Sequence, residues 1–194
     1  MASCINSNID YDFLNSEFNT YEQGKNLKTF YFSEGKKNFF LQTTTMKSYQ
    51  DYFFLKPESQ EGCILDTILV EFEFQNLNKD TLKNISIFSD SVSIVNYNND
   101  GDSIFEIFSQ EIIHYSNEDI IELKKDVELK NYNNNILKTN RLFWNIENNK
   151  ILSLDSVVIQ TSDKIIHGCG FYSDDNFDNY KIFNINGVIQ IESD

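Results

Sequence analysis

The sequence is poor in the residues that define fibrous, low-complexity and disulfide-rich proteins. Of its 194 residues, one is proline, seven are glycine and three are cysteine. Collagen-like and linker-like chains need far more glycine and proline, so both classes are excluded. Cys4, Cys63 and Cys169 are odd in number and widely spaced, which fits neither a disulfide scaffold nor a zinc site. We therefore expect free thiols in a reducing compartment.

Positive charge is scarce as well. Arg141 is the only arginine, and 30 acidic residues outnumber 16 lysines and arginines, which gives a net charge of −14. Nucleic acids and anionic lipids are bound by clustered cations, and arginine is the usual bidentate reader of phosphate and guanine. We expect no direct binding to nucleic acid and no membrane association.

The sequence also lacks a basic, apolar leader at its beginning and any long apolar run. A signal peptide is not evident, and no uninterrupted apolar stretch approaches the roughly 20 residues that span a bilayer. We expect a cytoplasmic or particle-associated protein.

Aromatic residues, by contrast, are plentiful. The hydrophobic fraction is 40%, with 17 Phe and 10 Tyr, which is enough to build a core for one domain. The clearest pattern lies in residues 63–75, where Ile68, Val70, Phe72 and Phe74 alternate with polar residues. Successive side chains of a strand point to opposite faces, so this stretch predicts a β-strand with one buried face.

Further strands are predicted on both sides of short polar turns. The Asp100-Gly101 pair is a strong hairpin signal because such turns need positive φ. The predicted strands span residues 27–33, 38–45, 84–97, 103–115, 141–147, 150–161, 165–172, 180–185 and 188–192. No alternation of strands with helices is evident, which argues against a parallel nucleotide-binding sheet.

Two segments favour short helices. Residues 1–26 are polar, with apolar residues at helical spacing after Asn8, and form an N-terminal arm or short helix. The run Ser116-Asn117-Glu118-Asp119 resembles a helix start, and Ile120, Leu123 and Val127 would form a buried stripe to about Lys125.

These elements predict an all-β, mainly antiparallel fold: a β-sandwich or jelly roll, with a curled barrel as the second arrangement. One domain would cover residues 27–194. The last hairpin turns at Asn186-Gly187, which places Ile185 opposite Val188 and Lys181 opposite Glu192.

Two stretches suggest chemistry. His167 and Cys169 lie two residues apart, and imidazole near a thiol is the arrangement that activates a cysteine nucleophile, with His114 as an alternative base. Yet side chains so spaced on a strand stand roughly 6–7 Å apart, so a buried structural thiol is favoured over a nucleophile.

Calcium is the other candidate ligand. Residues 96–107 lack the acidic first and twelfth positions of an EF-hand and are better explained as a hairpin. The loop at residues 174–178, with Asp174, Asp175 and Asp178, offers oxygen ligands for weak divalent cation binding, although acidic loops are usually only solvated. No cofactor motif is present, and we assign no catalytic, cofactor-binding or metal site.

Three classes of function remain. We favour a non-catalytic structural or assembly component, for example of a virion or phage particle, because catalytic residue types are scarce and strands dominate. The alternatives are an acidic inhibitor or decoy of a basic partner protein, and a cysteine-dependent enzyme that uses Cys169. For the favoured class, residues 188–191 would form an edge strand for pairing with a partner chain or a second copy.

Overall fold

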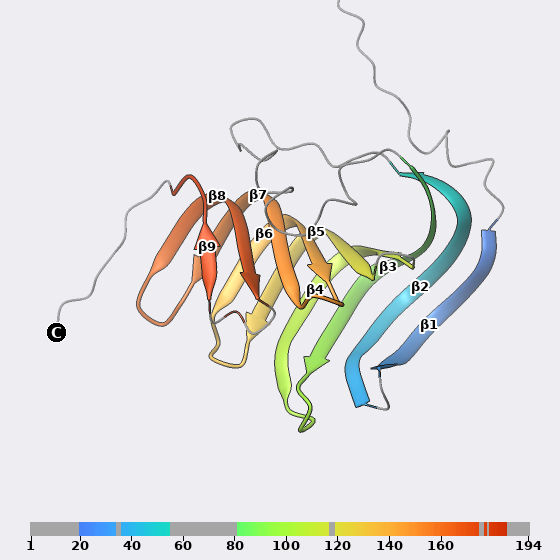
Figure 1. Ribbon diagram of the computed structural model, residues 1–194, viewed down its shortest axis with the longest axis horizontal. Coiled ribbons are helices and arrows are strands. Elements are labelled where there is room, and N and C mark those ends of the chain that lie inside the picture. Colours follow the sequence, from blue (N-terminus) through green and yellow to red (C-terminus); the bar gives the residue numbers. More distant parts are fainter. Residues whose placement is uncertain are drawn as a thin grey trace, which may run out of the picture.

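The strands that the structure describes form one antiparallel β-sheet, in which each pairs with the next described strand along the chain (Figure 1). This computed structural model describes residues 20–33, 36–54, 81–116, 119–174, 177 and 179–185. The nine strands in these ranges are β1 Thr20–Ser33, β2 Lys36–Phe54, β3 Thr81–Tyr97, β4 Ser103–Tyr115, β5 Ile120–Asn131, β6 Ile136–Asn145, β7 Lys150–Gln160, β8 Ile165–Asp174 and β9 Tyr180–Ile182.

A line of register shifts runs across the middle of the sheet. Matching shifts occur between neighbouring strands from β2 to β8, for example between Ser89 and Val92 and between Lys124 and Val127. In β3 and β5 the shift contains two consecutive non-glycine residues with positive φ, namely Asp90 and Ser91, and Lys125 and Asp126. Bulges bend strands and increase their twist, which accounts for the curl of the sheet in Figure 1.

Hydroxyl side chains bond to backbone carbonyls beside this line. The Thr43 hydroxyl donates to the carbonyl of Ser89 at 2.9 Å, and the Ser109 hydroxyl donates to the carbonyl of Glu111 at 3.2 Å. The Thr139 hydroxyl donates to the carbonyl of Ser156 at 3.0 Å. These bonds satisfy polar groups where the ladder between strands is disrupted.

The larger hydrophobic cluster lies on one face of the sheet, which we call the inner face. It includes Phe39 from β2, Phe105 from β4 and Trp144 from β6. The Trp144 ring lies 5.4 Å from the Phe39 ring and 5.3 Å from the Phe105 ring, measured between centroids. Side chains from strands that are not neighbours therefore meet, so the curled sheet packs against itself on this face.

A second cluster is buried on the opposite, outer face, toward one end of the strands. Its members are Ile85, Ile113, Tyr115, Ile120, Phe143, Leu152 and Leu154. Burial on both faces explains why Ile120 to Leu123 are all buried in sequence, although a strand with one wet face would alternate.

The all-β, antiparallel prediction is confirmed, and the helix at residues 116–125 is wrong. Residues from Ile120 onward belong to β5, and no helix occurs among the residues described. The spacing of Ile120, Leu123 and Val127 imitates a helix because the bulge at Lys125 and Asp126 inserts extra residues between two inner-face positions. The chain accordingly has no helix in its described part that is long and apolar enough to cross a membrane.

The predicted connectivity needs a further correction. The strands that the structure describes lie in a single sheet in chain order, so their connections are those of a meander, whereas a jelly roll needs Greek-key connections. β1 begins at Thr20, seven residues before the predicted start at Leu27. Residues 1–19, the strand at 63–75 and the turn and strand at 186–192 lie outside the described residues.

The predicted hairpins within the described range are confirmed. Gly101 has a φ of 90°, and the Asn98 side chain accepts hydrogen bonds from the backbone N–H groups of Asp100 and Asp102, each at 2.9 Å. β6 and β7 turn through Asn148 and Asn149, and β1 and β2 pair as expected.

Candidate functional site

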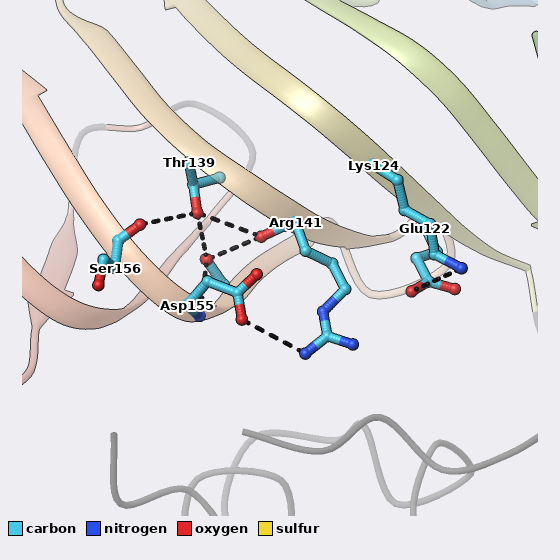
Figure 2. A network of polar contacts seen from close by, with 7 residues as sticks. Glu122, Lys124, Thr139, Arg141, Asp155 and Ser156 are labelled. Atoms are coloured by element: carbon cyan, nitrogen blue, oxygen red, sulfur yellow. Dashed lines mark hydrogen bonds and ion pairs between the residues drawn. The ribbon is translucent and has the colours of Figure 1, made fainter. Parts of the chain in front are cut away.

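A group of charged side chains lies on the outer face beside the line of bulges, and Figure 2 shows its members as sticks. Neighbouring strands bring the residues together: Lys124 of β5 lies directly opposite Arg141 of β6. Arg141 contacts Asp155 of β7, with Nη2 3.3 Å from Oδ1, and Lys124 Nζ lies 3.5 Å from Glu122 Oε1. The Tyr115 hydroxyl donates a hydrogen bond to the other carboxylate oxygen of Glu122, Oε2. We call Glu122, Lys124, Arg141 and Asp155 the charged network.

Both carboxylates of this network are buried. The side chains of Glu122 and Asp155 are 3% and 4% exposed, while that of Arg141 is 19% exposed. Burial raises the pKa of Asp155 above its ordinary value because the charged form loses hydration, and the nearby Arg141 guanidinium partly offsets this rise. The guanidinium carbon of Arg141 also lies 5.7 Å from the centre of the Phe143 ring, a cation–π distance.

Hydroxyl groups hold the backbone of the network in place. The Ser153 hydroxyl donates to the carbonyl of Arg141 at 2.8 Å, and the hydroxyls of Thr139 and Ser153 lie 2.9 Å apart. The backbone N–H of Asp155 donates to the Ser153 hydroxyl at 3.3 Å. Arg141 and Asp155 therefore project from a backbone that is cross-linked at the bend.

A pocket of about 350 Å³ opens beside the charged network, lined by Lys124, Lys125, Asn140, Arg141 and Asp155. Three cations in one pocket would suit a carboxylate or phosphate group. Each cation, however, already has an acidic partner, since Lys125 Nζ lies 3.4 Å from Glu111 Oε2. Three acids balance three cations, so the arrangement neutralises charge at the bend and offers no excess of positive charge to an anion.

Cys169, the candidate nucleophile, forms a disulfide bond that the sequence analysis did not predict. It lies on β8. The expectation of free thiols is therefore wrong for Cys169, and a disulfide sulfur cannot serve as the thiolate that a cysteine nucleophile requires. His167 is exposed on the same strand.

His114, the alternative base, lies on β4, four strands from Cys169 in the sheet order. It is opposite Ser86 and Ile121 on the neighbouring strands. Burial lowers the pKa of His114, and the negative charge of Asp119 raises it to a smaller extent. The structure therefore does not bring His114 together with Cys169.

The candidate calcium loop is described only in part. Asn179 Nδ2 donates to Asp174 Oδ2 at 3.5 Å, and both residues line a pocket of about 430 Å³ with Lys150, Tyr172, Tyr180 and Lys181. Within the described ranges, no three His, Cys, Asp or Glu side chains are grouped so that they could hold a metal ion. Asp175 and Asp178 lie outside those ranges.

Sequence reasoning missed an exposed aromatic group at one edge of the sheet. Phe30 and Phe32 of β1 are 49% and 59% exposed. The Phe30 ring lies 4.8 Å from the Phe40 ring of β2 and 6.3 Å from the Phe32 ring, between centroids. We call Phe30, Phe32 and Phe40 the β1 aromatic edge. The signal for it was the run Phe30-Tyr31-Phe32, which places an aromatic on both faces of the first strand.

Comparison with known proteins does not extend these observations. No protein-family model matches the chain, and no curated protein matches it.

Proposed function

We propose that this protein is a non-catalytic component of a multi-chain assembly and acts through contacts with other protein chains. The observation that carries the proposal is the β1 aromatic edge. Large exposed apolar side chains grouped on a protein surface favour contact with another protein chain, because that contact removes apolar area from water. Phe30 and Phe32 supply the apolar surface.

The polar sites support this proposal over its alternatives. The charged network pairs its charges internally, as expected of a structural cluster. The disulfide at Cys169 speaks against a cysteine-dependent enzyme. An acidic decoy would present its carboxylates to a partner, whereas Glu111, Glu122 and Glu128 pair with lysines of this chain.

Two finer parts of the proposal concern architecture and location. The contact of Trp144 with Phe39 and Phe105 supports a sandwich-like arrangement, in which the two halves of a curled sheet face each other. Of the two expected locations, a particle-associated one, as in a virion or phage component, suits an assembly protein with a disulfide at Cys169 better than the reducing cytoplasm does. Both are proposals.

Native mass spectrometry of tagged protein recovered from its own source tests the proposed function. We expect complexes heavier than the 22.7 kDa chain, and we expect the double variant Phe30→Ser/Phe32→Ser to lose them. Phe108→Ser is the matched control, because Phe108 is 46% exposed but lies on β4, which has a neighbouring strand on each side. If the wild-type chain is recovered only at its own mass, the proposal is wrong.

A further inference from the structure

The second pocket, of about 430 Å³, lies where β7 begins and β8 ends, apart from the charged network. Lys150 lies directly opposite Asp174, and Tyr172 lies directly opposite Lys181. Directly opposite residues of antiparallel strands point to the same face, and Tyr172 packs against the outer-face cluster. The strand register therefore gathers these four side chains on the outer face. The volume is within the range of about 300–1,000 Å³ that is usual for small-molecule sites.

Contacts within the chain hold the walls of this pocket. Lys150 Nζ lies 6.0 Å from the centre of the Tyr172 ring, a cation–π distance that keeps the amine over β8. The Ser173 hydroxyl donates to the carbonyl of Asn179 at 3.2 Å, which ties the loop after β8 to that strand. The ring of Tyr180, which also lines the pocket, packs on two phenylalanine rings at centroid distances of 5.4 and 5.9 Å. A pocket that is already formed loses less free energy when a ligand binds.

The two opposite charges in this pocket are not used up by each other. In the part of the chain that the structure describes, no ion pair joins Lys150 to Asp174, although they lie directly opposite. Asp174 Oδ1 is covered without a hydrogen-bond donor, and Oδ2 receives a long hydrogen bond from Asn179 Nδ2 at 3.5 Å. The pocket beside the charged network differs, because each of its cations has an acidic partner. This second pocket keeps the Lys150 amine and Oδ2 of Asp174 for a ligand.

We propose that this pocket binds a sugar residue of a glycan, an activity that goes beyond the proposed function and does not depend on it. Lys150 offers donors, the Asp174 carboxylate offers acceptors, and the Asn179 amide offers both. Every sugar hydroxyl donates and accepts, so neighbouring hydroxyls on one ring satisfy all three groups together. A small anion would be repelled by Asp174, and a metal cation would be repelled by Lys150 and Lys181.

Ligand-observed NMR on the purified whole chain, with its disulfide intact, tests the inference. The probes are D-glucose, D-galactose, D-mannose and N-acetyl-D-glucosamine. We expect saturable binding of at least one of them with a dissociation constant on the order of 1 mM, as is usual for so small a ligand. Lys150→Met and Asp174→Asn should each weaken binding about tenfold or more, because each removes a charge-assisted hydrogen bond. Asn179→Ala, at an exposed loop position, should also weaken binding and carries little risk to the fold.

Matched controls lie at the other end of the same hairpin. The turn between β7 and β8 contains Asp163 and Lys164, neither of which lines the pocket. Lys164→Met and Asp163→Asn should bind the sugar as the wild type does. Circular dichroism of each variant separates loss of binding from loss of fold.

Three results would overturn the inference. The absence of saturable binding for all four sugars would show that the pocket is not a sugar site. Binding that is unchanged in Lys150→Met, Asp174→Asn and Asn179→Ala would occur elsewhere on the chain. Saturable binding of inorganic phosphate or of glycine, with no sugar bound, would assign the pocket to an anion or to an amino acid. None of these results concerns assembly, so the proposed function would stand.

Discussion

At the scale of single residues, Arg141 and Asp155 show how charges are accommodated inside this sheet. Asp155 is almost fully buried, and its carboxylate would be costly there without the arginine beside it. Arg141 in turn extends along the Phe143 ring toward the outer face. The pair stabilises the bend only while both members are present, because either charge alone is left buried without compensation.

Arg141→Met should lower the free energy of unfolding by about 2–4 kcal/mol, since it leaves the buried Asp155 carboxylate unpaired. Urea denaturation at neutral pH measures the change. Adding Asp155→Asn to this variant should restore much of the loss. The control is Lys138→Met, which breaks an exposed pair with Glu128 and should cost less than about 1 kcal/mol. Equal losses in the two single variants would contradict the buried-pair interpretation.

His114 should make the protein less stable in acid. Its pKa is lowered in the folded state from the ordinary value of 6.5, so the unfolded chain binds the proton more readily. The contribution of neutral His114 to the free energy of unfolding is therefore constant above pH 6.5. It is lost as the pH falls from 6.5 through the pKa of the folded state, and the free energy of unfolding then decreases by at most about 1.4 kcal/mol per pH unit.

Denaturation curves above and below pH 6.5 measure this effect. The variant His114→Gln should lose less stability on acidification than the wild type. A His114→Gln curve that follows the wild-type pH dependence would show that His114 does not titrate as described.

At the scale of elements, the bulges determine the shape of the sheet. The pairs Asp90 and Ser91 in β3 and Lys125 and Asp126 in β5 hold positive φ angles between 53° and 71° without glycine. Side chains with a Cβ rarely adopt this conformation, so each position stores a small amount of strain. The strain is tolerated because the curl lets Trp144 pack against Phe39 and Phe105.

Ser91 offers a direct test of that strain, because its φ is 71° and its side chain is exposed. Ser91→Gly should raise the melting temperature or leave it unchanged, whereas Ser91→Val should lower stability by about 1–2 kcal/mol. Ser93→Val lies two residues away on the same strand, outside the positive-φ pair, and should be nearly neutral. Coinciding melts for the two valine variants would mean that β3 is not bulged at Ser91.

Sequence patterns predicted elements well where one simple rule applied. The hairpin at Gly101 was predictable because its turn residues demand positive φ. β5 was mistaken for a helix because a bulge and burial on both faces erase the two-residue period. The charged network was not predictable, since Lys124, Arg141 and Asp155 meet only through strand register and sequence spacing carries no trace of it.

At the scale of the whole molecule, the sheet has a packed inner face, a partly buried outer face, and a disulfide at Cys169. The sequence predicted the β class because aromatic and β-branched residues dominate. It did not show whether the strands form one curled sheet or the two sheets of a sandwich. The alternation of apolar and polar residues indicates which side chains are buried, but it carries no information on which strands are neighbours. The disulfide at Cys169 was not predicted either, because three widely spaced cysteines do not form the pattern of a disulfide scaffold.

The disulfide leads to a prediction for the intact protein. Three cysteines with one intrachain bond leave one thiol, so alkylation of the denatured, unreduced chain should label one cysteine, and prior reduction should label all three. Reduction should also lower the free energy of unfolding by about 2–4 kcal/mol, because the cross-link restricts the unfolded chain. Cys169→Ser should reproduce that loss and should respond little to a reductant. Labelling of Cys169 without reduction would show that the bond does not form in solution and would restore the expectation of a reducing compartment.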